Sequence, residues 1–461
     1  MSRPLALALA LSALLPATAF AEDLLQTYEL ARTGDPQLSA AESGRLAQKE
    51  GAVQARAQLL PQINGSASLS RSHVAGQDYS DPTTRSYSAN LDQTVFSWSS
   101  FANVRAQNAL SHAADFDLEA ASDSLVTRTS AAYFNVLVAI ETLSAAEAAE
   151  TALKRQFDYA DKRLEVGLAP ITDVHEARAT YDSARANTIA QRNVLKDAYQ
   201  ALTEITGTPI TNLKGLPDDF RPELPAGGDA ESWVASALEN NPSLKAIDYQ
   251  VKSAEQGVSS ARGGHYPTLS FGASYGNRNT WGGPAYDPDP TDPTSSARAG
   301  ESRSIGLTLN VPIFSGGATQ SRVREAIANR DIRQDQLEQQ RRAVERNTRN
   351  SYQTLVAGIS EIEARRLAVV SADAAYDASQ VGLEVGTRTV LDVLINQQKL
   401  FDARQAYAIA KYNYLQNRLL LEQSAGSLDY ADVQDVNRLL TVDANAQLDE
   451  AATQQEPPQV Q

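Results

Sequence analysis

The chain has 461 residues, of which 21% are charged, and its formal net charge is −15. It contains no cysteine, which excludes disulfides, thiolate metal sites and a cysteine nucleophile. The acidic balance also argues against nucleic acid as a partner, because a phosphate backbone would be repelled.

The first 21 residues have the pattern of a secretory signal peptide. Arg3 provides a positive end, Leu5 to Leu15 form an apolar core, and Ala19 to Ala21 is a small-x-small cleavage site. We therefore expect residues 1–21 to be a signal peptide. The apolar run is too short for a spanning helix, which needs about 20 residues, and no other run approaches that length.

Residues 22–230 predict a first structural repeat that contains helices, one β-hairpin and a connector. Residues 22–60 favour helix, and period-two alternation of apolar and polar residues then predicts a β-hairpin at about 62–96. Residues 98–166 contain neither glycine nor proline and predict a helix of roughly 100 Å. After a turn, a return helix to about residue 206 completes a helical hairpin at about 98–206.

The same order restarts and is expected to fill residues 231–428, with a β-hairpin at about 268–314 and a helical hairpin at about 318–426. Asn241-Pro242 repeats Asp35-Pro36 at an offset of 206 positions. Leu383 to Gly386 repeats Leu164 to Gly167 at an offset of 219, because the loop of the second β-hairpin is longer. The chain is therefore a tandem duplication. Residues 429–461 predict an acidic segment whose end is disordered.

Each return helix carries an apolar seam with a period of seven, which is typical of a coiled coil. The seams are Val174, Tyr181, Thr188, Leu195 and Leu202, and Val393, Leu400, Tyr407, Tyr414 and Leu421. Outside these narrow seams the long helices are polar, which suits a wall with water on both sides. Four strands cannot close a barrel, so several copies must pool them if they cross a membrane.

Two matching motifs carry a resemblance to a known family, Val166 to Val174 (VGLAPITDV) and Val385 to Val393 (VGTRTVLDV). Together with Lys411 to Leu415 and Ala425 to Leu428, they make the chain resemble the TolC family of outer-membrane efflux and secretion channels over residues 22–440.

This resemblance implies a mainly α fold with a β-barrel. Long antiparallel coiled-coil helices would form a periplasmic α-barrel, and a homotrimer would pool four transmembrane β-strands per protomer. It implies localisation in the lipid of the outer membrane, with a large periplasmic part. The expected partners are a periplasmic adaptor (membrane fusion) protein and an inner-membrane transporter of the ABC or RND type. The implied function is a passive exit duct for efflux or type I secretion, without a cofactor.

The resemblance also implies a gate at the pore entrance, formed by Thr172, Asp173, Arg388 and Asp392. Arg388 would tether its hairpin to the neighbouring one, with Thr172 and Asp173 as acceptors. From the residues alone, Arg388 could equally be a solvated charge, and Asp392 an acidic residue that favours a helix N-terminus. Members of this family often have a second aspartate three residues after the first, and a tyrosine that takes part in this tether. The corresponding residues here are Ile395 and Leu383.

The remaining candidate residues lie at the turns and at the strand ends. The adaptor-docking tips are expected at Val166, Gly167, Leu168, Val385, Gly386 and Thr387. Both glycines also suit a chain reversal. Pro61, Pro267 and Pro312 are expected at the junctions between barrel and helices. Trp98, Phe96, Phe314 and Tyr266 lie near these junctions and fit either an aromatic girdle or ordinary core packing.

Nothing in the sequence supports an enzyme. The four histidines have no metal-ligand spacing, and the motifs of serine hydrolases, zinc proteases and P-loop proteins are missing. A structural or adhesive coiled-coil surface protein is the alternative class, but the period-two strands, the duplication and the tip motifs argue against it. An autonomous porin is a third class, but that fold lacks helices of roughly 100 Å. The sequence does not distinguish exported proteins from exported small molecules.

Overall fold

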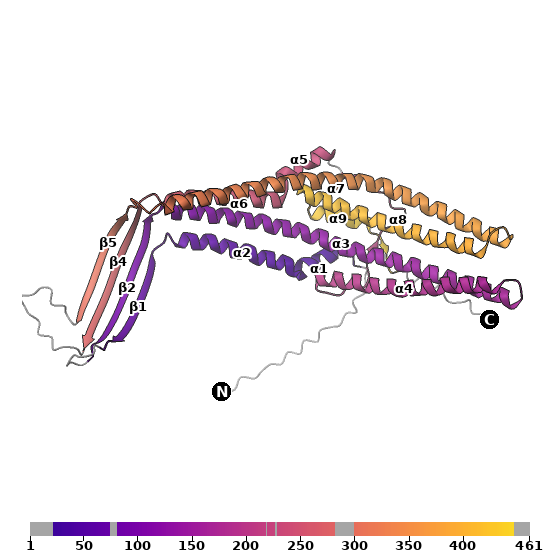
Figure 1. Cartoon of the computed structure of the whole chain (residues 1–461), viewed down its shortest axis with the longest axis horizontal. Helices are drawn as coiled ribbons and strands as arrows, with labels where there is room; N and C mark the ends of the chain where they lie inside the picture. Colours follow the sequence, from indigo (N-terminus) through magenta and orange to yellow (C-terminus); the bar gives the residue numbers. More distant parts are fainter. Residues whose placement is uncertain (1–21, 74–80, 218, 226–227, 282–298, 447–461) are drawn as a thin grey trace, which may run out of the picture. The chain divides into compact units, whose positions relative to one another are not determined.

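The computed structural model describes residues 22–73, 81–217, 219–225, 228–281 and 299–446 (Figure 1). The predicted signal peptide, the predicted disordered end from residue 447 and most of the long loop after Trp281 lie outside the described residues. None of the described helices combines the length and the apolar character that crossing a bilayer requires.

The chain forms two compact units, and neither coincides with a sequence repeat. Within the described part of the chain, the hairpin unit comprises residues 22–36, 123–234 and 348–446, and the sheet unit comprises residues 37–122 and 235–347. Each unit takes part of both repeats, because the long helices α3 (Trp98–Glu165) and α7 (Ala318–Glu384) contribute to both units.

The sheet unit contains one antiparallel sheet with the strand order β1-β2-β4-β5 (Figure 1). Its remaining elements are the first parts of α3 and α7 and two shorter helices. Its strands and shorter helices are α2 (Pro36–Ala57), β1 (Gln62–Arg71), β2 (Thr83–Phe96), α6 (Pro242–Gly263), β4 (Thr268–Trp281) and β5 (Ala299–Asn310). Consecutive strands in the chain pair as hairpins, and β2 joins the two hairpins by pairing with β4.

The two faces of this sheet have opposite chemistry. The register aligns Ile63, Leu91, Ala273 and Ile305 in one row, and the next row on the other face is Asn64, Asn90, Ser274 and Ser304. On the polar face, hydroxyl groups pair across strands, as between Ser274 Oγ and Ser304 Oγ at 2.7 Å. On the apolar face Ile305 is 75% exposed. Alternation with period two therefore produces one face suited to lipid and one suited to water.

The second hairpin is shorter than predicted. The hairpin was expected to extend to about residue 314, but β5 (Ala299–Asn310) ends four residues earlier. Pro312 has no N–H to donate to a strand partner, and Gly316 and Gly317 then turn the chain with positive φ angles of 62° and 85°. Pro61 and Pro267 each lie one residue before a strand.

Two of the junction aromatics pack on each other. The rings of Trp98 and Tyr266 meet edge to face at 6.0 Å, and Trp98 Nε1 donates to Ser259 Oγ at 3.1 Å. Phe96 packs on Phe101 at 6.1 Å, whereas Phe314 is exposed. Three of these aromatic residues, Trp98, Tyr266 and Phe96, therefore pack against another ring, and Phe314 is the one that is largely exposed.

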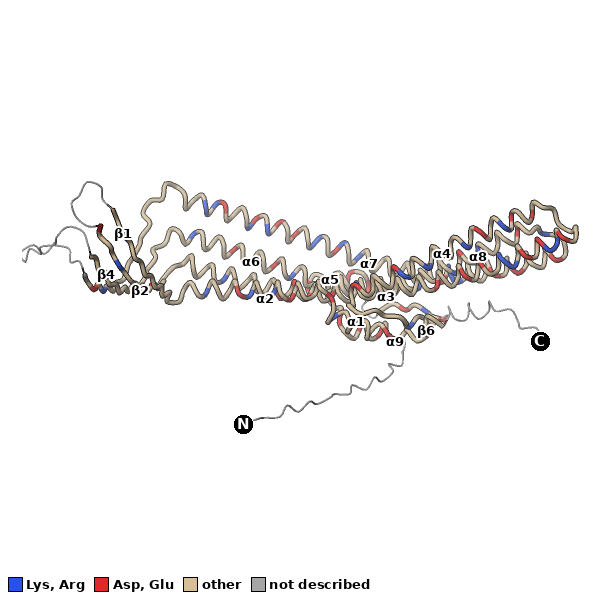
Figure 2. The backbone as a smooth tube through the Cα atoms, turned by 90° about the horizontal axis from the view of Figure 1, so that it is seen from below, with Lys and Arg blue, Asp and Glu red and all other residues tan. Residues whose placement is uncertain are grey.

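The hairpin unit contains the two helical hairpins and the small elements that pack on them. Acidic and basic residues are interspersed along its helices (Figure 2). Besides the second parts of α3 and α7, its elements are α1 (Leu24–Gly34), α4 (Ile171–Thr206), β3 (Lys214–Gly215), α8 (Val390–Ala425), α9 (Tyr430–Leu439) and β6 (Val442–Asp443). The boundary between the units falls within α5 (Ala230–Asn240), after Val234.

The core of the hairpin unit lies where α3 and α8 come together. Tyr133 is fully buried, and its hydroxyl donates to Lys214 O at 2.8 Å. Tyr412 donates to Glu141 Oε1 at 3.0 Å. The predicted seams of α4 and α8 are buried or half-buried at every position, so the period of seven identified the packed faces of the return helices.

Candidate functional site

The first tip joins α3 to α4 and is closed by backbone hydrogen bonds. Leu168 N donates to Arg163 O at 2.8 Å, and the Arg163 guanidinium donates to Leu168 O at 3.2 Å. Gly167 has a φ of +73°, a conformation that other residues adopt only with strain. Pro170 occupies the N-cap of α4 and provides no side-chain hydrogen bond.

The second tip joins α7 to α8 and is organised around one carbonyl. Gly382 O accepts from Thr387 N at 2.8 Å, from Arg388 N at 3.1 Å and from Thr387 Oγ1 at 3.1 Å. Gly386 has a φ of +78°. The turn therefore holds Thr387 and Arg388 directly over the last turn of α7.

Asp392 and Thr389 form a capping box at the start of α8. Thr389 N donates to Asp392 Oδ2 at 2.9 Å, and Asp392 N donates to Thr389 Oγ1 at 3.2 Å. The hydrogen bond from the Thr389 N–H lowers the pKa of Asp392, with smaller contributions from the Thr389 hydroxyl and the Arg388 charge. Asp392 is therefore an ionised helix cap. Thr389 was not among the predicted site residues, although the capping-box pattern T-x-x-D from Thr389 to Asp392 could have identified it.

The structure does not bring all four predicted gate residues together. Thr172 Oγ1 donates to its neighbour Asp173 Oδ1 at 3.4 Å, at the start of α4. Arg388 and Asp392 lie close enough to interact electrostatically at the second tip. Among the described residues of a single chain, Arg388 makes no hydrogen bond or ion pair with Thr172 or Asp173. Any such tether must therefore form between copies or in another state.

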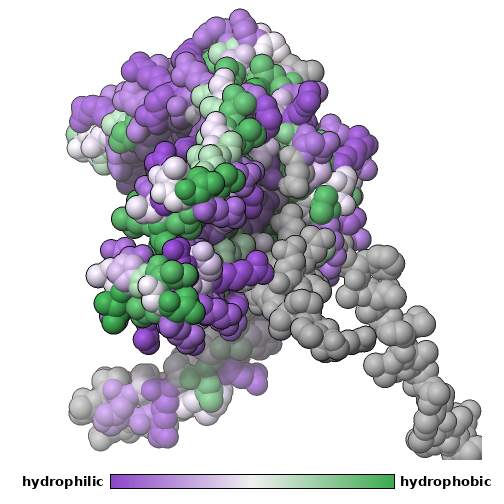
Figure 3. Space-filling model, turned by 90° about the vertical axis from the view of Figure 1, so that its right-hand side faces the viewer, coloured by the Kyte–Doolittle hydropathy of each residue, from purple (hydrophilic) through white to green (hydrophobic). Residues whose placement is uncertain are grey.

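Three of the six predicted docking residues present apolar side chains to solvent: Val166, Leu168 and Val385 are each 68% exposed. Leu391, which the prediction did not include, is 50% exposed nearby in the first turn of α8. Figure 3 views the molecule from the right-hand side of Figure 1 and shows hydrophobic residues among hydrophilic ones on this surface. Contiguous exposed apolar patches mark protein-binding surfaces, whereas singly exposed apolar residues are common on any protein surface.

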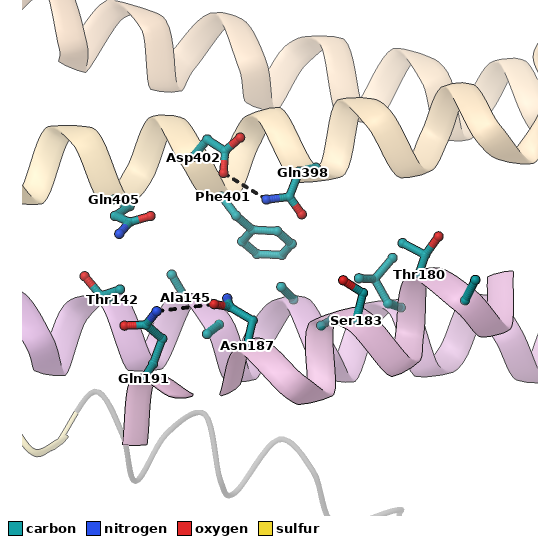
Figure 4. A pocket seen from close by; sticks show the side chains of 15 residues that line it. Thr142, Ala145, Thr180, Ser183, Asn187, Gln191, Gln398, Phe401, Asp402 and Gln405 are labelled. Atoms are coloured by element: carbon teal, nitrogen blue, oxygen red, sulfur yellow. Dashed lines mark hydrogen bonds between the residues drawn. The ribbon is translucent and has the colours of Figure 1, made fainter. Parts of the chain in front are cut away.

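A cavity of about 720 Å³ lies between the two helical hairpins (Figure 4). α3 and α4 line it mainly with small side chains such as Ala145 and Ser183, and α8 contributes Phe401 and Asp402. Gln398 Nε2 donates to Asp402 Oδ1 at 2.8 Å. Within the described part of the chain, no three His, Cys, Asp or Glu side chains gather in a set that could hold a metal ion.

Comparison with known proteins identifies the family. The family model described as outer membrane efflux protein matches residues 27–208 and 233–427, and so covers both repeats. Outer membrane protein TolC of Escherichia coli (strain K12) is 34% identical over 91% of this chain and 85% of its own length. The alkaline protease secretion protein AprF of Pseudomonas aeruginosa is 30% identical over 91% of this chain and 88% of its own.

A solved structure shows the same fold. The CmeC outer membrane channel of Campylobacter jejuni matches with a TM-score of 0.76 and 20% identity, over 91% of this chain and 90% of that chain. The sequence matches and the shared fold lead to one conclusion: the chain belongs to the outer membrane efflux protein family.

Proposed function

We propose that the chain is the outer-membrane exit duct of a tripartite efflux or type I secretion system. The observation that carries this proposal is the open four-stranded sheet, with one exposed apolar face and one hydroxyl-rich face. β1 and β5 each have a single neighbour, and unpaired strand edges in lipid would leave N–H and C=O groups unsatisfied. Copies therefore pool their strands, and a trimer would make a twelve-stranded barrel.

The helical tips would receive a periplasmic adaptor, which couples the duct to an inner-membrane transporter. The exposed side chains of Val166, Leu168 and Val385 support this assignment, because they offer apolar contact area at both turns. The duct itself would be passive, without catalysis, and the transporter would supply the energy. The names of the relatives and of the family support both cargo classes, since AprF is named for alkaline protease secretion and the matching family model is described as outer membrane efflux protein.

The gate would be a set of charge-assisted contacts between tips of neighbouring copies. Arg388 would donate to Thr172 and Asp173 of an adjacent hairpin, since these groups do not meet within one chain. Asp392 would supply a ring of ionised carboxylates at the entrance, and its lowered pKa supports a charged state at neutral pH. Several weak contacts of this kind can hold a gate that a partner can still open.

Single-channel conductance of the purified protein in a planar bilayer tests this proposal. Wild type should conduct weakly, and Arg388→Ser and Asp173→Ala should each conduct several-fold better, because each removes one side of the latch. A large wild-type conductance that neither substitution changes would remove the gate from the proposal. A trimer that never conducts would instead support the structural or adhesive class.

A further inference from the structure

The backbone conformation at Gly382 in α7 is one that any residue could adopt. Gly382 lies in the last turn of the helix, four residues before Gly386, and unlike Gly386 it is not among the residues with positive φ. Glycine is the least favourable residue in a helix interior apart from proline. A reason for glycine at this position must therefore lie in the space around its Cα atom.

Arg388 occupies that space. A Cβ atom on residue 382 would lie 2.6 Å from Arg388 Cγ, 3.2 Å from Arg388 Cβ and 3.3 Å from Thr387 Oγ1. The backbone cannot easily move away, because Thr387 N and Arg388 N both donate to Gly382 O. A different rotamer of Arg388 would relieve the closest of these contacts, the one at Cγ, and would redirect the guanidinium, whereas the contact at Arg388 Cβ needs only a shift of a few tenths of an ångström.

The first tip has the same combination of residue types at exchanged positions. At the offset of 219, Gly382 corresponds to Arg163 and Arg388 corresponds to Ala169. In that tip the arginine comes before the turn, where it donates to Leu168 O and lies over the Tyr159 ring at 5.6 Å. Each tip thus combines one arginine with one small residue at these two positions.

We propose that Gly382 is a positioning residue for Arg388, whose side chain it directs across the last turn of α7 into the latch. This inference rests on the proposed gate, and it adds a residue that acts only through Arg388. It makes an unusual prediction: Gly382→Ala should strengthen the helix and yet open the channel, since alanine favours helix but excludes the Arg388 rotamer.

The experiment compares four full-length trimers with wild type in planar bilayers containing KCl. They are Gly382→Ala, Arg388→Ser, the double variant and Gly358→Ala. Gly358 is a matched control in the same helix, because its added Cβ would meet only Tyr414 Cδ2 at an ordinary 3.8 Å. Thermal stability of each trimer is measured in parallel, so that a leak caused by misfolding is recognised.

We expect Gly382→Ala to raise open probability about tenfold, equivalent to about 1.4 kcal/mol, with unchanged or higher thermal stability. The double variant should match Arg388→Ser, and Gly358→Ala should match wild type. If Arg388→Ser opens the channel but Gly382→Ala does not, or if the two effects multiply, the positioning role is wrong. If Arg388→Ser itself has no effect, the proposed gate fails and the positioning role fails with it.

Discussion

The two helical hairpins, α3/α4 and α7/α8, descend from one repeat and differ at three levels. At the turn, Pro170 in the first hairpin corresponds to the capping residue Thr389 in the second. In the middle, Phe157 stacks on Tyr181 at 6.2 Å, whereas the corresponding Tyr376 binds amide side chains.

At the base, Thr203 of the first hairpin corresponds to the buried carboxyl of Glu422 in the second. At all three levels, the first hairpin carries an apolar or non-titrating residue where the second carries a hydrogen-bonded or titratable one. The return helices of both hairpins pack through the same kind of apolar seam. The difference between the hairpins therefore lies in the polar residues at these corresponding positions. We expect the second hairpin to respond more strongly to pH and to loss of single hydrogen bonds.

The largest expected effect is on the base of the second hairpin. Glu422 is 5% exposed, and its Oε2 has no hydrogen-bond partner among the described residues. The charged groups that act on it are Arg418 on α8, at 3.5 Å, together with Asp429 and Asp432 at the start of α9, and Arg418 also lies 4.0 Å from Asp435. Burial, and secondarily the charge of Asp432, raises the pKa of Glu422 to about 7.

Because the pKa is raised on folding from an ordinary value of 4.5, the protonated carboxyl is favoured in the native state. Its contribution to stability is complete below pH 4.5 and is lost as the pH rises towards 7. Hydrogen exchange should therefore show the α8–α9 amides better protected at pH 6 than at pH 8, after correction for intrinsic rates. Glu422→Gln should remove most of this difference and protect the region at pH 8. Better protection of wild type at pH 8 would contradict the assignment.

The second-largest effect is expected in the middle of the second hairpin, around Tyr376. Tyr376 OH accepts from Gln380 Nε2 at 2.6 Å and from Gln397 Nε2 at 3.3 Å, and Gln397 is 4% exposed. Tyr376→Phe copies the first hairpin but leaves a buried amide without its partner, so we expect a loss of about 1–3 kcal/mol in unfolding free energy. Thermal or denaturant unfolding of the trimer would measure it.

The double variant Tyr376→Phe/Gln397→Leu should recover most of that loss, because both polar partners are then gone. Tyr181→Phe in the first hairpin is the matched control, since its hydroxyl makes no hydrogen bond within the described residues. A double variant no more stable than Tyr376→Phe would show that the amide is not the cause.

The smallest effect concerns the turn. Thr389→Ala removes the hydroxyl that accepts from Asp392 N, and we expect a loss of about 1 kcal/mol of local stability. The converse change, Pro170→Thr, should create the same cap with Asp173 in the first hairpin. Hydrogen exchange of the first-turn amides of α8 and α4 would measure both, and protection should move in opposite directions. Equal exchange in Thr389→Ala and wild type would exclude the capping role.

The extent of the helices and most strands could be predicted because local residues set it. α3 runs from Trp98 to Glu165, one residue short of the predicted end, since no glycine or proline interrupts it before Gly167. The two turns were located by glycines whose positive φ only glycine adopts readily. The seams were found because a period of seven is a property of one helix.

Contacts between distant residues were decided only by the tertiary structure. The compact units cross the repeat boundary, because α3 and α7 are shared between them. The missing single-chain contact of Arg388 with Asp173 could not be predicted from motifs, which record residue types without distances. Gly382 was overlooked for the same reason: its small size matters only because Arg388, six positions later, folds back over it. The sequence by itself determined the elements and the family, and folding determined which side chains meet.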